Sequence, residues 1–297
     1  MTATTIETVD VALPAPGIAT GSAAPGAEAA HGVDRLKAGL RNVVVMTRRN
    51  LVHIAREPMQ LSDMTVQPLL FTLLFVYVFG SGIPISGGSY VNFALAGLLT
   101  LNLTTSALGT AVGLSTDLST GMIERFRTLP MWRSSVLVGR TLSDVLSAAL
   151  CVTIVGLTGL AIGWRPGHDV LSVLAGFGVA LLFSYALSWA TACLGLLSKG
   201  PESAMSMGFI VIFPLAFVSN ALVPTAHMPA WLRFIANWNP VSAVTAAART
   251  LFGNPNPTTS HAWPMQHPVV AALAWSIAII AVAAPLAAHL FRQRTAE

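Results

Sequence analysis

The chain has 297 residues, of which 54% are hydrophobic and only 9% are Asp, Glu, Lys or Arg, and its mean hydropathy is +0.69. A soluble domain carries about 25% charged residues. The composition therefore excludes most soluble enzymes and indicates a membrane protein built from apolar stretches of about 20 residues. The two cysteines both lie inside such stretches, which supports neither a disulfide framework nor a zinc site.

The N-terminal region divides into two parts. Residues 1–34 are rich in Ala, Gly, Thr and Pro and predict a disordered tail without a signal peptide. Between Asp34 and Arg56, apolar residues recur near a period of 3.6, and five Arg and one Lys fall largely between them. This pattern predicts an amphipathic helix along the inner leaflet, within a connecting segment at 35–61. The alternative is an ordinary helix packed on a cytosolic domain.

Six apolar stretches follow the connecting segment, and each is long enough to cross a bilayer as a helix. They cover about residues 62–82, 90–114, 136–164, 170–197, 204–223 and 268–290. With the N-terminus in the cytoplasm, 13 of the 16 Lys and Arg fall on cytoplasmic segments. The positive-inside rule therefore predicts a multi-pass protein with both termini in the cytoplasm, including a short tail at 292–297.

The chain has no site for ATP hydrolysis of its own. A phosphate-binding P-loop requires a Lys followed by Ser or Thr, but Lys37 precedes Ala and Lys199 precedes Gly. The seven His are scattered, and neither an HExxH nor a GxSxG motif occurs. The sequence therefore predicts a chain that is not an enzyme, with no catalytic residue, no metal site and no cofactor.

One pair of opposite charges lies within the predicted membrane region. Asp144 follows Arg140 by four residues, so the two side chains share one face of a helix. We expect a structural ion pair, and the alternative is a role in handling substrate or protons.

The predicted inner loop between the second and third stretches contains TGMIERFRTLP, in which Met122, Ile123, Phe126 and Leu129 share one helical face. Pro130 favours a helix end at Leu129. The sequence predicts a short amphipathic helix that either caps the bundle or enters a groove on a cytosolic partner.

At this point the residues resemble a known family. The run from Glu124 to Pro130, followed by Arg133, Leu137, Gly139, Arg140 and Asp144, is similar to permease subunits of type-2 ABC exporters of the daunorubicin and doxorubicin resistance branch. The blocks Gln67–Gly80 and Phe213–Gly253 extend the resemblance, which covers nearly all of residues 35–291.

The resemblance implies an all-α polytopic protein with six transmembrane helices in a domain at 62–291. It implies a partner pair of separate ATPase subunits that bind ATP and Mg²⁺, a second permease copy in a homodimer, and a bacterial plasma membrane location without nucleic acid. It also implies a coupling helix at about 118–129, whose ATPase contacts would be Glu124, Arg125, Phe126, Arg127, Leu129, Pro130 and Arg133. Re-entrant helices after the fifth span would carry Trp231, Trp238 and Arg249 in the outer leaflet.

The implied function is ATP-driven export of amphipathic drugs, antibiotics or lipid-like molecules. Residues that face the bundle would line the substrate path, or alternatively serve packing and interhelical hydrogen bonds; they are Phe75, Tyr77, Phe79, Asn92, Asn102, Phe213, Phe217 and Asn220. The alternatives are export of a polysaccharide, a lipid or sodium by the same architecture, or a membrane scaffold without transport.

Overall fold

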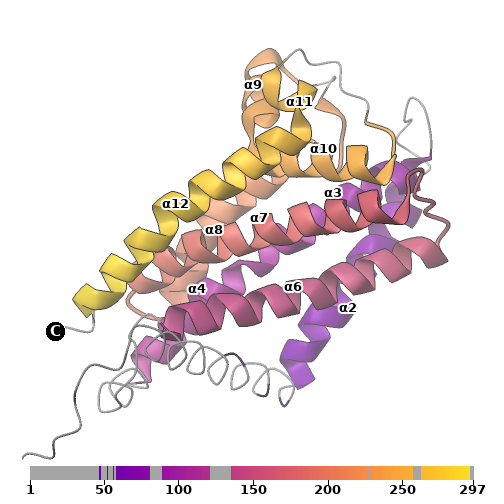
Figure 1. The fold of residues 1–297 in the computed structure, drawn as a ribbon. Coiled ribbons are helices and arrows are strands. Elements are labelled where there is room, and N and C mark those ends of the chain that lie inside the picture. The colour runs from indigo at the N-terminus through magenta and orange to yellow at the C-terminus, as the bar shows by residue number, and fades with distance from the viewer. Residues whose placement is uncertain are drawn as a thin grey trace, which may run out of the picture. The chain divides into compact units, whose positions relative to one another are not determined.

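The computed structural model describes residues 47, 52, 56, 58–80, 89–120, 135–225, 228–256 and 262–294. The chain divides into two units, residues 1–38 and 39–297, and the first lies wholly outside the described residues. In the second unit, every regular element within the described ranges is a helix (Figure 1). The predicted all-α class is therefore confirmed for this part of the chain.

The helices differ widely in length. In chain order they are α2 (Pro58–Leu74), the π-helical turn η1 (Phe75–Phe79), α3 (Tyr90–Ser106), α4 (Leu108–Ser119), α6 (Ser135–Ala161), α7 (Val170–Leu197), α8 (Pro201–Phe217), α9 (Ala230–Trp238), α10 (Pro240–Phe252), α11 (Trp263–Gln266) and α12 (Pro268–Arg294). Four helical stretches are long and apolar enough to cross a membrane, namely Tyr90–Ser119, Leu137–Ala161, Val170–Leu197 and Pro268–Arg294. Two apolar helices, Thr65–Phe79 and Pro201–Phe217, are shorter. The chain is thus a multi-pass membrane protein.

Two helices differ from the expected stretches. The stretch expected at 90–114 continues to Ser119 and is interrupted at Ala107, where α3 ends and α4 begins. The stretch expected at 204–223 is helical only from Pro201 to Phe217. At the end of α8 the side chain of Asn239 donates hydrogen bonds to the carbonyls of Leu215 at 2.7 Å and Val218 at 2.6 Å. These bonds satisfy carbonyls that a longer helix would have paired.

Helix α7 is at the centre of the bundle and packs against α12, α4, α10 and α6. It begins after Asp169, whose carboxylate accepts a hydrogen bond from the Ser172 hydroxyl at 2.7 Å, and this bond lowers the pKa of Asp169. The core between α7 and α10 contains Trp164, Phe177 and Phe252, with ring centroids 4.9–6.4 Å apart. These large side chains fix how α10 sits on α7.

Close packing of α7 on α4 depends on Gly195. A Cβ at this position would lie 2.5 Å from the carbonyl oxygen of Ala111. We expect Gly195→Ala to lower the stability of the purified protein by about 1–3 kcal/mol, because the two helices must move apart. Gly178, on the same helix, has nothing within 4 Å of such a Cβ. The matched change Gly178→Ala should stabilise by up to about 1 kcal/mol, and equal unfolding midpoints in detergent for both variants would contradict this explanation.

The two ends of the bundle carry different structures. At one end α4, α7 and α12 terminate while α6 and α8 begin, and we call this the Arg294 end (Figure 1). There Arg294 of α12 donates hydrogen bonds to the carbonyls of Leu196, Leu197 and Ser198 at 3.1–3.4 Å, which caps α7. The opposite end carries α9, α10 and α11, and we call it the α10 end (Figure 1).

Candidate functional site

Two rows of phenylalanine side chains run along exposed helix faces. In α2 and η1, Phe71, Phe75 and Phe79 follow one another with ring centroids 5.9 and 5.1 Å apart, and we call them the α2 row. In α8, the rings of Phe209, Phe213 and Phe217 are 4.8 and 4.3 Å apart, and we call them the α8 row. The i, i+4 spacing on a helix stacks such rings along one side.

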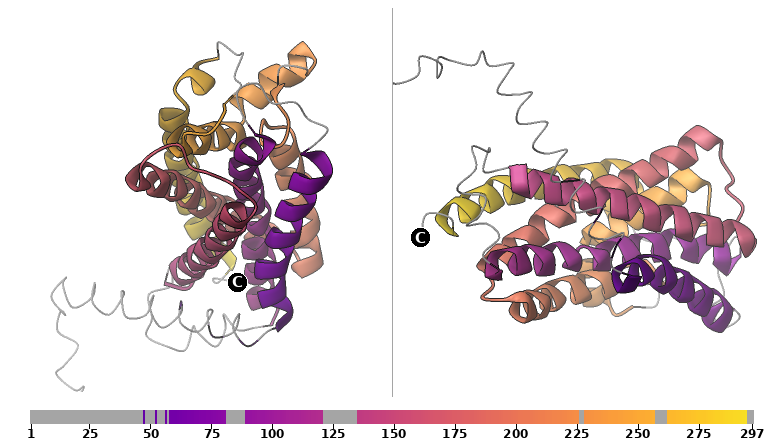
Figure 2. Two further views of the ribbon diagram at one scale, coloured as in Figure 1. Left: turned by 90° about the vertical axis from the view of Figure 1, so that its right-hand side faces the viewer. Right: turned by 90° about the horizontal axis from the view of Figure 1, so that it is seen from below.

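The α8 row is exposed along its whole length, because its three side chains have exposed fractions of 43–47%. In the α2 row, Phe71 and Phe79 are about 40% exposed and Phe75 is half-buried. Figure 2 shows in both views that α2 and α8 lie on the same side of α3 and α4. We call the six phenylalanines of the two rows together the aromatic face. Large exposed apolar surfaces of this kind mark binding sites or contacts with lipid or protein.

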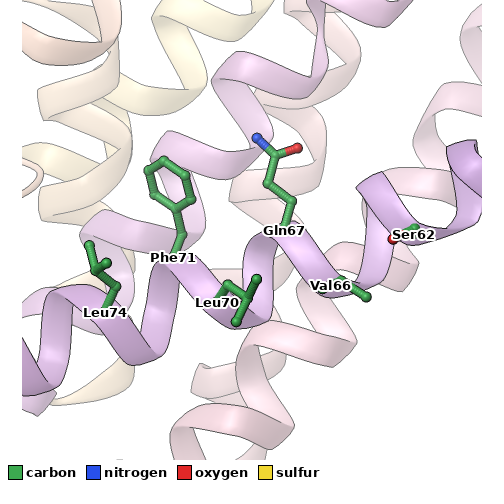
Figure 3. A pocket seen from close by; sticks show the side chains of 6 residues that line it. All are labelled: Ser62, Val66, Gln67, Leu70, Phe71 and Leu74. Atoms are coloured by element: carbon green, nitrogen blue, oxygen red, sulfur yellow. The ribbon is translucent and has the colours of Figure 1, made fainter.

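A shallow hollow of about 430 Å³ lies on α2 beside the α2 row. Its lining residues are Ser62, Val66, Gln67, Leu70, Phe71 and Leu74, which project from one helix (Figure 3). Gln67 is the one amide in this apolar lining. The hollow therefore offers an apolar wall with two polar groups, the Ser62 hydroxyl and the Gln67 amide, a composition typical of sites for amphipathic ligands.

The structure separates the three asparagines that were expected to line a path with the phenylalanines. Asn102 is half-buried and donates to the carbonyl of Leu98 on its own helix at 2.8 Å. Asn92 accepts from the backbone N–H of Arg165, in the α6–α7 connection, at 3.3 Å. Asn220 is buried, and its side-chain nitrogen lies 3.6 Å from the sulfur of Met265. Only the phenylalanine members of the expected set thus belong to the two rows. The 70% exposed Tyr77 of η1 lies two residues from both Phe75 and Phe79 and so on the other side of the helix.

Arg140 and Asp144 form an ion pair, with Nε and Oδ1 3.6 Å apart. The other carboxylate oxygen accepts a hydrogen bond from the Thr110 hydroxyl at 2.7 Å, and Nη2 of Arg140 donates to the carbonyl of Gly109 at 3.1 Å. A Cβ on Gly113 would overlap the Arg140 guanidinium. The pair therefore joins α6 to α4, the two helices that flank residues 120–134.

The expected re-entrant residues occupy two different environments. Trp231 and Trp238 are 67% and 45% exposed on α9, and Phe234 and Ile235 share that exposure. Arg249 on α10 is 1% exposed. Helix α10 is covered by α12, α7 and α3 and contains no Trp, so Arg249 is enclosed in the bundle whereas the two expected tryptophans are exposed on α9.

The expected coupling residues, from Glu124 to Arg133, lie outside the described residues, as does most of the expected connecting helix. Of that helix, Thr47, Val52 and Arg56 are described, and the Thr47 hydroxyl donates to the carbonyl of Gly139 on α6 at 3.3 Å. Within the described ranges, no three His, Cys, Asp or Glu side chains group in a way that could hold a metal ion.

Several residues of the site were not singled out from the sequence. Phe71 and Phe209 extend the two rows, and the repeated i, i+4 spacing of phenylalanine could have identified them. Gln67 begins the block Gln67–Gly80 that resembles the family, but no site was assigned to it. Thr110 and Gly113 have no signal in the sequence, because their partners on α6 are about 30 residues away.

Comparison with known proteins decides the family. The model of the ABC-2 type transporter family matches residues 41–252. The chain belongs to the ABC-2 type transporter family. It is 34% identical over 240 residues to the daunorubicin resistance ABC transporter permease protein DrrB1 of Streptomyces coeruleorubidus, covering 81% of this chain and 82% of the relative. It is 26% identical over 212 residues to the doxorubicin resistance ABC transporter permease protein DrrB of Mycobacterium tuberculosis, covering 71% of each chain.

The family match and the similarity to DrrB1 confirm the resemblance to permease subunits of type-2 ABC exporters that the sequence blocks indicated. The matched region runs from the connecting segment through the end of α10, so it includes both phenylalanine rows, the Arg140–Asp144 pair and Arg249. The matches cover most of each relative's own length. The likeness therefore concerns the transporter chain as a whole and not one segment of it.

Proposed function

We propose that this chain is the permease subunit of an ATP-driven exporter that moves amphipathic drugs, antibiotics or lipid-like molecules out of a bacterial cell. Two relatives are named for resistance to daunorubicin and doxorubicin. The chain itself has no P-loop, so ATP and Mg²⁺ would bind to separate ATPase subunits.

The observation that carries this proposal is the aromatic face. Six phenylalanines form two stacked rows, one on α2 and η1 and one on α8. Helices α2 and α8 lie on the same side of α3 and α4 (Figure 2). Stacked or edge-on contacts between aromatic rings are worth about 0.5–1.5 kcal/mol beyond the area that they bury. A planar aromatic drug with a polar substituent would stack on these rings and place its polar group near Gln67, the amide of the neighbouring hollow (Figure 3).

A second copy of the chain would supply the opposite wall of the path. The hollow beside the α2 row is lined by residues of α2 alone. Two copies facing each other through their aromatic faces would enclose the rows, and each copy would bind one ATPase. Rocking of the two copies as the ATPases close would carry the drug along the rows.

For the topology, we propose six spans, with α2 plus η1 and α8 crossing in addition to the four long stretches. The Arg294 end would face the cytoplasm, because it carries Lys199, Arg292 and Arg294 among the described residues. Helix α9 would lie at the outer interface, where its exposed tryptophans match the preference of Trp for the boundary between lipid and water. Helix α10 would enter the outer leaflet without crossing it and would be sheltered by its neighbours.

The test is accumulation of daunorubicin in inside-out membrane vesicles that contain the chain and the ABC ATPase that co-purifies with it. We expect accumulation that requires ATP hydrolysis. Phe213→Ala should raise KM for daunorubicin about fivefold, because one aromatic contact is worth about 1 kcal/mol. The matched control is Ile277→Ala on α12, which removes a 60% exposed apolar side chain away from the aromatic face and should leave KM unchanged.

Other cargoes give different results in the same vesicles. ATP-dependent movement of a polysaccharide, a lipid or sodium without any movement of daunorubicin would contradict the proposed cargo. The absence of any ATP-dependent transport would support a scaffold and contradict the proposal altogether.

A further inference from the structure

Arg249 is a buried cation whose hydrogen-bond acceptors are backbone carbonyls. Its Nε donates to the carbonyl of Phe93 on α3 at 3.0 Å. Its Nη2 donates to the carbonyls of Asn220 at 3.0 Å and Ala221 at 2.8 Å, in the segment that follows α8. The guanidinium carbon lies 3.7 Å from the centroid of the Phe93 ring. One side chain of α10 thereby holds α3 and the end of the α8 segment together.

Among the described residues, no carboxylate lies within ion-pair distance of this guanidinium. Burial of a charge without a counter-charge costs several kcal/mol, whereas an apolar side chain of the same length would cost nothing of this kind. The guanidinium is distinguished by its fork of five N–H donors in one plane, which can bind several carbonyls at once. An Arg at this position is therefore explained by the three backbone carbonyls to which it donates hydrogen bonds, and not by pairing with a carboxylate.

Two of the three carbonyls, those of Asn220 and Ala221, belong to residues 218–222, where helix α8 has ended and no regular element has begun. A backbone of this kind at membrane depth needs partners inside the protein. Three further contacts fix it. The side chain of Asn239 binds the Val218 carbonyl, the Ser242 hydroxyl accepts from the Asn220 N–H at 2.9 Å, and the Ala221 carbonyl presses on α3 where a Cβ on Gly97 would overlap it.

The same segment connects the two phenylalanine rows. Phe217, the last member of the α8 row, immediately precedes it. Leu222, at its other end, packs against the cluster that contains Val76 and Phe93, and Phe75 of the α2 row packs against the same cluster. A shift of the segment relative to α3 would therefore move the α8 row relative to the α2 row.

We propose that Arg249 is a positioning residue that locks residues 218–222 onto α3 and so sets the register between the two phenylalanine rows. The lock itself follows from the contacts, and its consequence for drug recognition rests on the proposed export function. Loss of the lock should free the segment at the α10 end and weaken drug binding while the ATPase cycle continues.

The lock is tested by thiol labelling of the full chain in native membranes, which requires neither a drug nor an ATPase. Leu222→Cys provides the reporter, and a membrane-impermeant maleimide is the probe. The natural thiols Cys151 and Cys193 are buried, and the chain without the reporter gives the background. Adding Arg249→Met should raise the labelling rate at 222 about tenfold or more, because three hydrogen bonds to a charged donor are lost.

A second variant reaches the same segment without changing any charge. Gly97→Ala places a Cβ against the Ala221 carbonyl and should also raise labelling at 222. Arg165→Met is the matched control, because it removes an exposed arginine of the α6–α7 connection and should leave the rate unchanged. A reporter at the exposed Trp231→Cys should be labelled at one rate in all backgrounds. Unchanged labelling at 222 in both variants would overturn the lock, and so would a rise at 231 that matches the rise at 222.

The consequence for recognition is tested in the daunorubicin vesicles. Arg249→Met should raise KM about fivefold or more and leave basal ATP hydrolysis within about twofold, since the lost contacts act on the rows and not on the ATPase interface. Arg249→Lys should be intermediate, because an ammonium cannot bridge carbonyls as a fork does. A loss of kcat and ATP hydrolysis together with an unchanged KM would overturn the positioning role. If the unmodified chain transports no daunorubicin, the export proposal fails, and the labelling result still decides whether the lock exists.

Discussion

Replacing Glu124 and Phe126 by Ala together is expected to abolish ATP-dependent drug accumulation while the chain still inserts into the membrane. Both residues belong to the segment that resembles a coupling helix, and a short helix that enters a groove binds through a few anchor side chains. Loss of two anchors, each worth about 2 kcal/mol, would weaken binding of the ATPase about 1,000-fold if the two losses add. The measurements are drug accumulation in vesicles, drug-stimulated ATP hydrolysis and the amount of ATPase retained on the purified chain.

The matched control for that variant is Met131→Ala, which lies just beyond the proline where the predicted helix ends. It should retain both the ATPase and transport. Normal ATP-dependent accumulation by the Glu124 and Phe126 double variant would show that energy does not enter through this loop, and the assignment of the coupling helix would then be wrong.

Removal of the Asp144 carboxylate is expected to have the largest effect on stability. In Asp144→Leu, the guanidinium of Arg140 stays beside Gly109 and Gly113 but loses its counter-charge, and the Thr110 hydroxyl loses its acceptor. The two side chains are 18% and 19% exposed, so breaking the pair from one side should cost less than the roughly 3–5 kcal/mol of a fully buried pair. Unfolding of the purified chain in detergent, followed by helical circular dichroism, measures the loss.

Two further variants separate the pair from a general effect of removing charge. Glu202→Leu removes an exposed acid at the start of α8 and should cost less than about 1 kcal/mol. The double change Arg140→Met with Asp144→Leu should recover most of the lost stability, because no unpaired charge remains. A double variant as unstable as Asp144→Leu would show that the Asp144 site depends on its shape or on Thr110 and not on the pairing of charges.

The parts of the fold that could be predicted from the sequence are those fixed by local pattern. Helix α7 spans Val170–Leu197, as the uninterrupted apolar run between Asp169 and Ser198 indicates. The starts of α9 and α10 follow from Pro229, which precedes α9, and from the Asn239–Pro240 pair, in which Asn239 caps α10 and Pro240 is its first residue. The spacing of Arg140 and Asp144 could be read in the same way, because i, i+4 neighbours meet on any helix.

The end of α8 could not be predicted, because its cause lies far away in the sequence. The residues after Phe217 are apolar enough to continue a span, and what replaces their helical hydrogen bonds is the side chain of Asn239 and that of Arg249, some 20 to 30 residues later. For the same reason the resemblance placed Arg249 on a re-entrant helix but could not show that it is the most completely buried charged side chain among the described residues.

The candidate site shows the same division. The phenylalanines of the two rows carry a local signal, the repeated spacing of four, and they share the aromatic face. The asparagines carry no such signal. The direction of an asparagine side chain depends on which neighbouring group offers a hydrogen-bond partner. The Asn92 side chain binds the α6–α7 connection at Arg165, and Asn220 contacts Ser242 and Met265 at the α10 end.

We propose above all that the chain draws its energy from a separate ABC ATPase. Affinity purification of the full-length chain from its native membranes in a mild detergent, with quantitative mass spectrometry of what it retains, tests that claim most directly. We predict one ABC ATPase subunit for each copy of the chain, in a complex that contains two copies of each. A stable complex of the chain that retains no ABC ATPase, from cells in which the chain is active, would contradict it.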